Sequence, residues 1–360
     1  MNLIKNISII FLIIWILYPI KLLSQTDSIT LNKSEWEAFP IINYDSDAGF
    51  GYGGKGFLYN FLNGKESIDL TLYNSTKGER WYRFVFSATD IQRRQGKKYP
   101  IAFDLTADYD RWMKYKYYAS YYDYSEGGQK EKTFNYERET FELTALLSKG
   151  FTKDFVAELG IRFKSINCPG FDPADYSIFI NNFTSHVEVA SLIFNFRLDT
   201  RKNFINPQNG FVFEIDNEIA RDLIKPPAQN FYKIGVISQS YTNLFIPDLV
   251  FANRAIFQAV SDVGYQLLLP LGGNNTLRGL PQDRYLSTST ILINSELRFP
   301  IFRRLGGIAG VDIGNGESTP DWIINPVAGL RFYMDNFVVR FDIGFSKETT
   351  GIYFNFGHIF

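Results

Sequence analysis

Arg278 is the residue whose type and position most clearly suggest chemistry. It lies in a long connecting segment, 263–286, and two carboxylates follow it at Glu296 and Asp312. A connection this long is usually functional or disordered. A guanidinium can bind a carboxylate through two parallel hydrogen bonds. Two interpretations stay open from these residues alone. Either Arg278 reaches a carboxylate, or it is an exposed loop arginine while Glu296 and Asp312 pair with other charges.

Little else in the chain supports catalysis or metal binding. One Cys and two His exclude a disulfide framework and most thiolate-rich or His-rich metal centres. Neither His has the sequence signature of nucleophilic catalysis. Asp104, Asp108 and Asp110 share one face of the predicted strand 99–111 and could bind a cation, although such a group is more often a solvated charged patch. We therefore expect no enzyme activity, no cofactor and no metal. The formal net charge of −1 gives no reason to expect a nucleic-acid partner.

The elements that must position these side chains are strands. Aromatic residues make up 17% of the chain, yet its mean hydropathy is only −0.13. In 101–109, 155–163, 211–218 and 337–345, apolar and polar residues alternate, which places them on opposite faces of a strand. Such stretches reach about ten residues, the length that crosses a bilayer at a tilt. Only a closed barrel satisfies the backbone hydrogen bonds of strands in lipid.

We therefore predict an all-β fold, a 16-stranded antiparallel transmembrane β-barrel. The predicted strands are 47–62, 66–75, 80–92, 99–111, 115–124, 133–148, 153–166, 184–199, 209–221, 230–245, 248–262, 287–301, 305–315, 324–334, 337–346 and 351–360. An even number is usual for bacterial single-chain barrels. The longer connections 125–132, 167–183, 222–229 and 263–286 all follow odd-numbered strands, as expected if they lie at one end of the barrel.

The N-terminus is predicted to be a secretory signal peptide over residues 1–24. Lys5 precedes an apolar run over 7–20, which is short for a membrane-spanning helix. A retained N-terminal anchor is the alternative. Residues 25–45 are then expected to form a short periplasmic segment, and 46–360 the barrel.

Three segments carry motifs of a known family. They are Asp199-Thr200-Arg201 with Pro207 and Gly210, then Gly272-Gly273 with Leu277-Arg278-Gly279, and then Glu296-Leu297-Arg298-Phe299-Pro300 followed by Val311-Asp312-Ile313-Gly314. In their order and spacing they resemble the BamA/TamA family of outer-membrane proteins, the bacterial surface antigen family. The first looks like that family's periplasmic turn and the second like the tip of its inward-folded loop. Leu277 stands where the family usually has Val, and Leu280 where it has an aromatic residue.

The resemblance implies a barrel in the outer membrane of a Gram-negative bacterium that assists insertion or translocation of polypeptides. It also implies that the loop 263–286 folds inward and that Arg278 pairs with Asp312, with Glu296 as second partner. Family members normally carry POTRA domains before the barrel, and residues 25–45 cannot encode one. We therefore expect a member without POTRA domains and, besides outer-membrane lipid and a polypeptide substrate, a separate periplasmic partner. The alternative is a passive pore or a structural barrel.

Glycines in the first and last predicted strands indicate a weak seam between them. Gly51, Gly53 and Gly54 lie in the first strand and Gly357 in the last, and glycine weakens a strand interior. A weak seam matches the lateral gate attributed to the family. The alternatives are that glycine makes room for aromatic neighbours such as Phe50 and Tyr52, or forms a bulge.

The end of the chain resembles a recognition signal for outer-membrane barrel assembly. In the predicted strand 351–360, Phe360 shares a face with Ile352, Phe354 and Phe356. The resemblance implies that the barrel-assembly machinery is a partner for the protein's own insertion.

Overall fold

The computed structural model describes residues 34–123, 128–169, 185–224, 230–334 and 337–360, without the side chains of 119–123 and 128–130. Sixteen strands form the barrel: β1 (Glu35–Asp45), β2 (Gly49–Tyr59), β3 (Ser67–Ser75), β4 (Glu79–Ala88), β5 (Tyr99–Asp123), β6 (Gly128–Gly150), β7 (Phe155–Asn167), β8 (His186–Asp199), β9 (Gly210–Asp222), β10 (Asn230–Asn243), β11 (Val250–Val260), β14 (Ser289–Phe302), β15 (Leu305–Gly316), β16 (Ile323–Tyr333), β17 (Val338–Phe345) and β18 (Thr350–Phe356). The shorter elements are α2 (Ile91–Arg94), the 3-10 helix η1 (Tyr265–Leu267), β12 (Leu269–Leu271) and β13 (Tyr285–Ser287).

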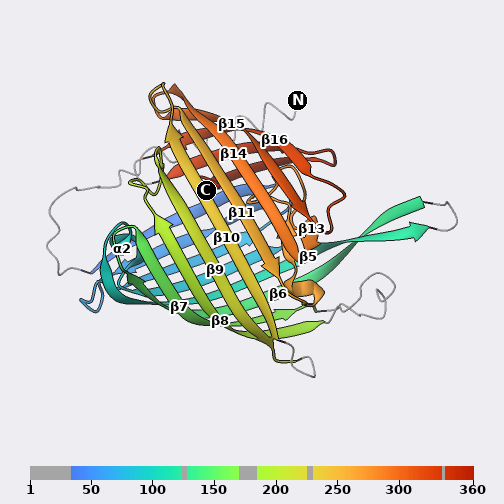
Figure 1. Cartoon of the computed structure of the whole chain (residues 1–360), viewed down its shortest axis with the longest axis horizontal. Helices are drawn as coiled ribbons and strands as arrows, with labels where there is room; N and C mark the ends of the chain where they lie inside the picture. Colours follow the sequence, from blue (N-terminus) through green and yellow to red (C-terminus); the bar gives the residue numbers. More distant parts are fainter. Residues whose placement is uncertain (1–33, 124–127, 170–184, 225–229, 335–336) are drawn as a thin grey trace. The chain divides into compact units, whose positions relative to one another are not determined.

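The barrel closes by antiparallel pairing of each strand with its neighbour in the chain, and of β1 with β18. The one interruption is that β11 pairs with β14, because β12 and β13 form a separate two-stranded sheet between them. We call the end of the barrel with the short connections 244–249 and 303–304 the turn end. The opposite end, with the connection 261–288, is the loop end. In Figure 1 the turn end lies to the left, near α2, and the loop end to the right.

The predicted fold, a closed antiparallel barrel of sixteen strands, is confirmed. The strand count is right because two errors cancel, since one strand was missed and another was divided into two. Residues 35–45 form the barrel strand β1, so the expected boundary between 45 and 46 is wrong. Pro40 weakens the strand pattern there, because proline has no N–H to donate to a neighbouring strand. Proline is tolerated in β1 because this strand pairs only with β2 over residues 35–43, so one of its edges needs no donor. Conversely, the predicted strands 99–111 and 115–124 are one strand, β5. A register shift between Trp112 and Tyr115 marks a bulge that interrupts the alternation.

The predicted signal peptide, 1–24, lies outside the described residues, as do residues 25–33. None of the helices in the described ranges is long and apolar enough to cross a membrane.

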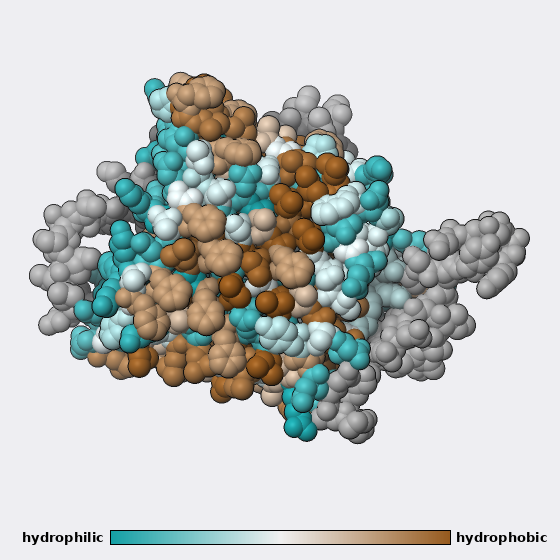
Figure 2. All heavy atoms as spheres, viewed as in Figure 1, coloured by the Kyte–Doolittle hydropathy of each residue, from teal (hydrophilic) through white to brown (hydrophobic). Residues whose placement is uncertain are grey.

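The outward side chains of the barrel form an apolar band. Ile101, Ile161 and Ile324 are each at least 60% exposed, although isoleucine is among the residues most often buried in soluble proteins. Figure 2 shows brown and tan residues across the middle of the visible face, between hydrophilic teal margins near the two ends. This sorting matches a barrel whose outer surface contacts lipid.

The inward side chains of β14–β17 include many charged groups. The largest fully buried side chains in the described structure are four arginines, Arg278, Arg298, Arg331 and Arg340. Buried ionised groups need paired charges and hydrogen bonds around them. The lumen therefore holds an ionic core where a soluble domain would have an apolar one.

Strands β5 and β6 extend beyond the barrel wall at the loop end, where Figure 1 shows their hairpin projecting to the right. They are 25 and 23 residues long, and a strand crosses a bilayer with about 9–11 residues. Part of their length therefore stands outside any membrane layer.

The glycines Gly51, Gly53 and Gly54 are not at the seam, so that part of the seam prediction is wrong. They lie in β2, which pairs on both sides at each of the three positions, with β1 and with β3. A Cβ atom at Gly51 would lie 2.3 Å from the hydroxyl of Tyr73, and one at Gly53 would lie 2.0 Å from the backbone oxygen of Leu72. Gly51 thus makes room for an aromatic side chain, as the alternative interpretation held, but the aromatic residue is on β3.

This geometry separates two neighbouring glycines experimentally. Gly53→Ala should destabilise the barrel by about 1–3 kcal/mol because the added Cβ collides with backbone. Gly54→Ala is the matched control, since its Cβ meets nothing closer than the Phe39 oxygen at 3.8 Å. Urea unfolding of both variants in detergent, followed by tryptophan fluorescence, measures the difference. Equal unfolding midpoints would contradict the account of β2.

Candidate functional site

The segment between β11 and β14 folds back into the lumen and carries Arg278 at its inner turn. Two consecutive glycines at positive φ, Gly272 at 126° and Gly273 at 94°, reverse the chain after β12. The side chain of Thr276 fastens this turn, because its hydroxyl accepts from the Gly272 N–H at 2.9 Å and donates to the Gly272 carbonyl at 2.8 Å. We call residues 264–287 the inner loop.

Arg278 is fully buried and contacts three carboxylates. Its Nε and Nη2 donate to the two oxygens of Asp312 at 2.8 Å each, which is the bidentate arrangement. Its Nη1 donates to Glu296 at 2.8 Å and to Asp342 at 2.9 Å. Burial lowers the pKa of this loop guanidinium, but the three carboxylates outweigh burial and raise its pKa well above the ordinary value. The structure thus brings Arg278 together with both carboxylates expected from the sequence, and with a third.

Three further arginines complete the ionic core around these carboxylates. Arg298 contacts Glu296 at 3.0 Å, and Arg331 lies 3.5 Å from the same carboxylate and also pairs with Asp342. Arg340 lies 3.8 Å from Asp342. Strands β14, β15, β16 and β17 contribute these six side chains at inward positions. Because every member is almost completely buried, removing one charge leaves its partners unpaired in a poorly solvated site.

The backbone of the inner loop is held as firmly as the side chain of Arg278. The Arg278 N–H donates to Asp312 at 3.1 Å, and Asn325 donates to the Arg278 carbonyl at 3.0 Å. Asn294 donates both to the Thr276 carbonyl, at 2.9 Å, and to Asp312, at 2.7 Å. These contacts fix the position of the turn, so Arg278 enters the carboxylate cluster in one orientation.

The inner loop also contacts both sides of the place where the barrel closes. The Gly279 N–H donates to the hydroxyl of Tyr353 on β18 at 3.1 Å, and the Gln282 N–H donates to Asp47, in the turn after β1, at 2.7 Å. Gly279 has φ of 96°, and a Cβ there would lie 2.8–2.9 Å from the backbone of Gly344 on β17. The inner loop therefore bridges the two sides of the closure from within.

The closure itself is short. Strand β1 pairs with β18 at two positions, Tyr44 with Phe354 and Asp45 with Tyr353, whereas it pairs with β2 at all eleven of its residues. Ser46 adds a clamp at the loop end, where its hydroxyl accepts from the Ile352 N–H at 2.6 Å and donates to the Ile352 carbonyl at 3.1 Å. From Asn43 toward the turn end, the edge of β1 that faces β18 has no strand partner among the described residues. The strand that closes the barrel against β18 is therefore β1 and not β2, and Gly357 lies beyond the end of β18 and not within the last strand as expected. That this closure acts as a weak seam or gate stays a prediction.

The last residues leave the barrel wall, which corrects the prediction for Phe360. Strand β18 ends at Phe356, and Gly357 turns the chain with φ of 80°. The ring of Phe360 lies 5.2 Å from the Arg254 guanidinium and 5.1 Å from that of Arg298. It therefore points into the lumen and does not share the outer face of Phe354. Its role as an assembly signal stays a prediction.

The predicted turn motif has a structural role at the turn end. Arg201 contacts Asp199 through Nε at 2.9 Å and Nη2 at 2.8 Å, and Thr200 pairs with Phe211 through backbone and hydroxyl. Gly210 has φ of 125°, and a Cβ there would lie 2.9 Å from the Arg201 Cα. The fifth member of the motif, Pro207, is buried. The motif therefore fixes the connection between β8 and β9.

Two of the three β5 aspartates singled out from the sequence, Asp104 and Asp108, are engaged by side chains of neighbouring elements. Asp104 pairs with Arg94 of α2, and Asp108 accepts from the Trp81 indole at 2.8 Å and lies 3.7 Å from Arg83. In the described ranges, no group of three His, Cys, Asp or Glu residues is placed to hold a metal ion.

Sequence reasoning missed four contributors, Asp342, Arg331, Arg340 and Tyr353. Arg340 and Asp342 do lie at polar positions of the alternation in 337–345, so their inward direction was visible. Their proximity to Arg278 was not, because it depends on how far the inner loop reaches across the lumen.

Comparison with known proteins places this site in a family context. The Omp85 superfamily domain matches residues 74–360. A BamA structure from Haemophilus ducreyi lacking POTRA domains 1–3 has a TM-score of 0.64 at 14% identity, over 90% of this chain and 70% of that one. CdiB from Escherichia coli has a TM-score of 0.58 at 14% identity, over 89% of this chain and 62% of that one. CdiB from Acinetobacter baumannii has a TM-score of 0.55 at 12% identity, over 90% and 60%. The chain thus spans less than two thirds of either CdiB structure. No curated protein matches significantly.

Removing the Arg278 charge tests the docking of the inner loop. Arg278→Ala should reduce the free energy that holds the inner loop in its docked position by about 3–5 kcal/mol, because it leaves buried carboxylates unpaired. Proteolysis followed by mass spectrometry should then show faster cleavage within 263–286. Arg303→Ala, at an exposed turn position, is the matched control and should cleave like the unaltered protein. Unchanged cleavage and unchanged heat-modifiability of Arg278→Ala would count against a docked loop.

Proposed function

Because the chain belongs to the Omp85 superfamily, we propose that it assists the insertion or translocation of polypeptides at the outer membrane of a Gram-negative bacterium. The observation that carries the proposal is the closure between β1 and β18, which has two residue pairs where the neighbouring β1–β2 contact has eleven. A strand edge without a partner can pair with another extended segment. The closure is thus the place where a substrate strand would enter the wall.

The inner loop supports the same proposal. It contacts β18 through Tyr353 and the turn after β1 through Asp47, so its docked position favours a closed wall. If the wall opens, these two contacts must separate from each other. The ionic core would then hold the loop on the β14–β17 side while β1 moves away. Arg278 and its carboxylates act in this proposal as a structural anchor and not as a catalytic group.

The outward apolar band supports the proposed membrane location. The proposed partners are outer-membrane lipid and a polypeptide substrate. The separate periplasmic partner and the barrel-assembly machinery expected from the sequence stay predictions. A passive pore, the alternative from the sequence, requires no movement of β1 and therefore predicts a different result in the experiment below.

A disulfide across the closure tests whether the wall must open. In a Cys168→Ala background, Tyr44→Cys with Phe354→Cys links β1 to β18 at a paired position. We expect oxidation to reduce the rate of nascent-barrel insertion into liposomes to the rate without the protein, and reduction to restore it.

The matched control uses the same residue on the other edge of β1. Tyr44→Cys with Phe50→Cys links β1 to β2 and should leave the insertion rate unchanged. If neither oxidised variant nor the unlinked protein accelerates insertion, the insertase proposal fails. A stable conductance in single-channel recordings that is the same for linked and unlinked protein would instead support the passive pore.

A further inference from the structure

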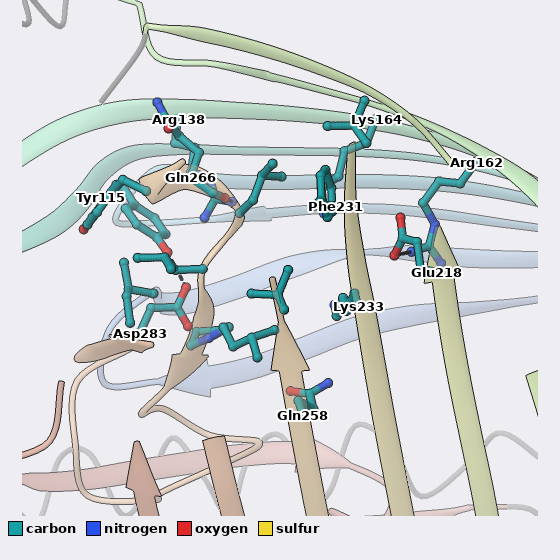
Figure 3. A pocket seen from close by; sticks show the side chains of 18 of the residues that line it. Tyr115, Arg138, Arg162, Lys164, Glu218, Phe231, Lys233, Gln258, Gln266 and Asp283 are labelled. Carbon is teal, nitrogen blue, oxygen red and sulfur yellow. Dashed lines mark hydrogen bonds and ion pairs between the residues drawn. The ribbon is translucent and has the colours of Figure 1, made fainter. Parts of the chain in front are cut away.

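A cavity of about 350 Å³ lies in the lumen, away from the ionic core, between the inner loop and the wall from β5 to β11. Figure 3 shows Arg162 and Glu218 on one side of it and Tyr115 with Asp283 of the inner loop on the other. Its volume falls in the range of pockets that bind small molecules. The wall strands here are continuously paired, so access is from the lumen and not from lipid.

The charged lining of this cavity is unequally paired. Four cations, Arg138, Arg162, Lys164 and Lys233, line it together with two carboxylates, Glu218 and Asp283. Arg162 contacts Glu218 at 3.1 Å, and both Arg162 and Lys164 contact Glu142 nearby, at 3.1 and 3.4 Å. These two cations are therefore neutralised.

The other two cations lack a carboxylate partner in the described part of the chain. Arg138 donates to the Gln266 carbonyl at 3.5 Å and lies 4.9 Å from the Tyr115 ring, while its buried Nε has no hydrogen-bond partner among the described residues. Lys233 forms no ion pair with the described side chains. Arg138 and Lys233 are half-buried, and the carboxylates nearest to them, Asp283 for Arg138 and Asp216 for Lys233, lie beyond ion-pair distance. A partly desolvated cation with no carboxylate in contact is unfavourable, so both positions would gain from an anion at contact distance.

Part of the remaining lining is apolar, beside the amide groups of Gln258 and Gln266. Val189, Phe231, Val260 and Leu269 line the cavity and belong to one buried cluster, each at most 8% exposed. Leu269 comes from the inner loop and the other three from the wall. Two cations without a carboxylate in contact thus adjoin a buried apolar cluster, a combination that favours a ligand with a charged head and an apolar body.

We propose that this cavity binds a small organic anion, a carboxylate or phosphate ester on an apolar body, which enters from the lumen. The anionic group pairs with the free cations of the wall, and the apolar body covers Phe231 and Leu269. Because the cavity is formed partly by the inner loop, a bound anion joins that loop to the wall on the side opposite its ionic anchor. The site would therefore stabilise the docked loop.

The probe for this site is 4-fluorophenyl phosphate, followed by fluorine NMR with the protein in phosphatidylcholine nanodiscs. We expect saturable binding that empty nanodiscs do not show. Equal binding of uncharged 4-fluorophenol would overturn the role of charge. Equally tight competition by inorganic phosphate would overturn the role of the apolar surface.

Charge variants locate the binding. Lys233→Gln and Arg138→Gln should each weaken probe binding at least fivefold. Lys153→Gln, which removes an exposed charge at the turn end, is the matched control and should bind as the unaltered protein does. The same affinity in all three variants would overturn the assignment. Bound probe should also slow proteolysis within 263–286, and an unchanged rate would overturn the stabilisation of the loop. These readouts do not depend on insertion activity.

Discussion

The interaction on which the rest of the structure depends is the burial of one guanidinium among three carboxylates inside the barrel. The Arg278 side chain is completely enclosed, and so are Asp312, Glu296 and Asp342. Such a group is tolerated only when all its charges are paired in good geometry, and it is strongly destabilised when one partner is missing. The arrangement is therefore close to all-or-none. It fixes where the inner loop sits and attaches the loop to the side of the barrel formed by β14, β15 and β17.

The docked loop compensates for a weak place in the wall. A closed barrel leaves no strand edge exposed, yet β1 and β18 share two residue pairs. Hydrogen bonds from the loop to Tyr353 and to Asp47 lie on the two sides of this short contact. The closure is thus held from the lumen as well as along the strands, and its stability is tied to the position of the loop.

Period-two alternation made most of the wall predictable, because it is a local property of each strand. It failed where local pattern and pairing diverge. Pro40 obscured β1, and the bulge after Trp112 divided β5. For the site, the loop motif and the polar positions of Glu296 and Asp312 indicated the right group of residues. Asp342, Arg331 and Tyr353 could not be assigned to that group, since their proximity depends on the curvature of the closed sheet and the reach of the loop. The inward course of Phe360 depends likewise on arginines distant in the chain.

The pairing of β1 with β18 has a consequence for the order of folding. It joins Tyr44 to Phe354, so almost the whole chain must be in place before these residues can meet, and contacts of such long sequence separation form slowly. Two residue pairs offer little free energy against the entropy of closing so large a ring. The loop contacts to Asp47 and Tyr353 share the same requirement. Ring closure and the last loop contacts should therefore form together as the final step of folding, and an unclosed barrel with an anchored loop would be the species that precedes it.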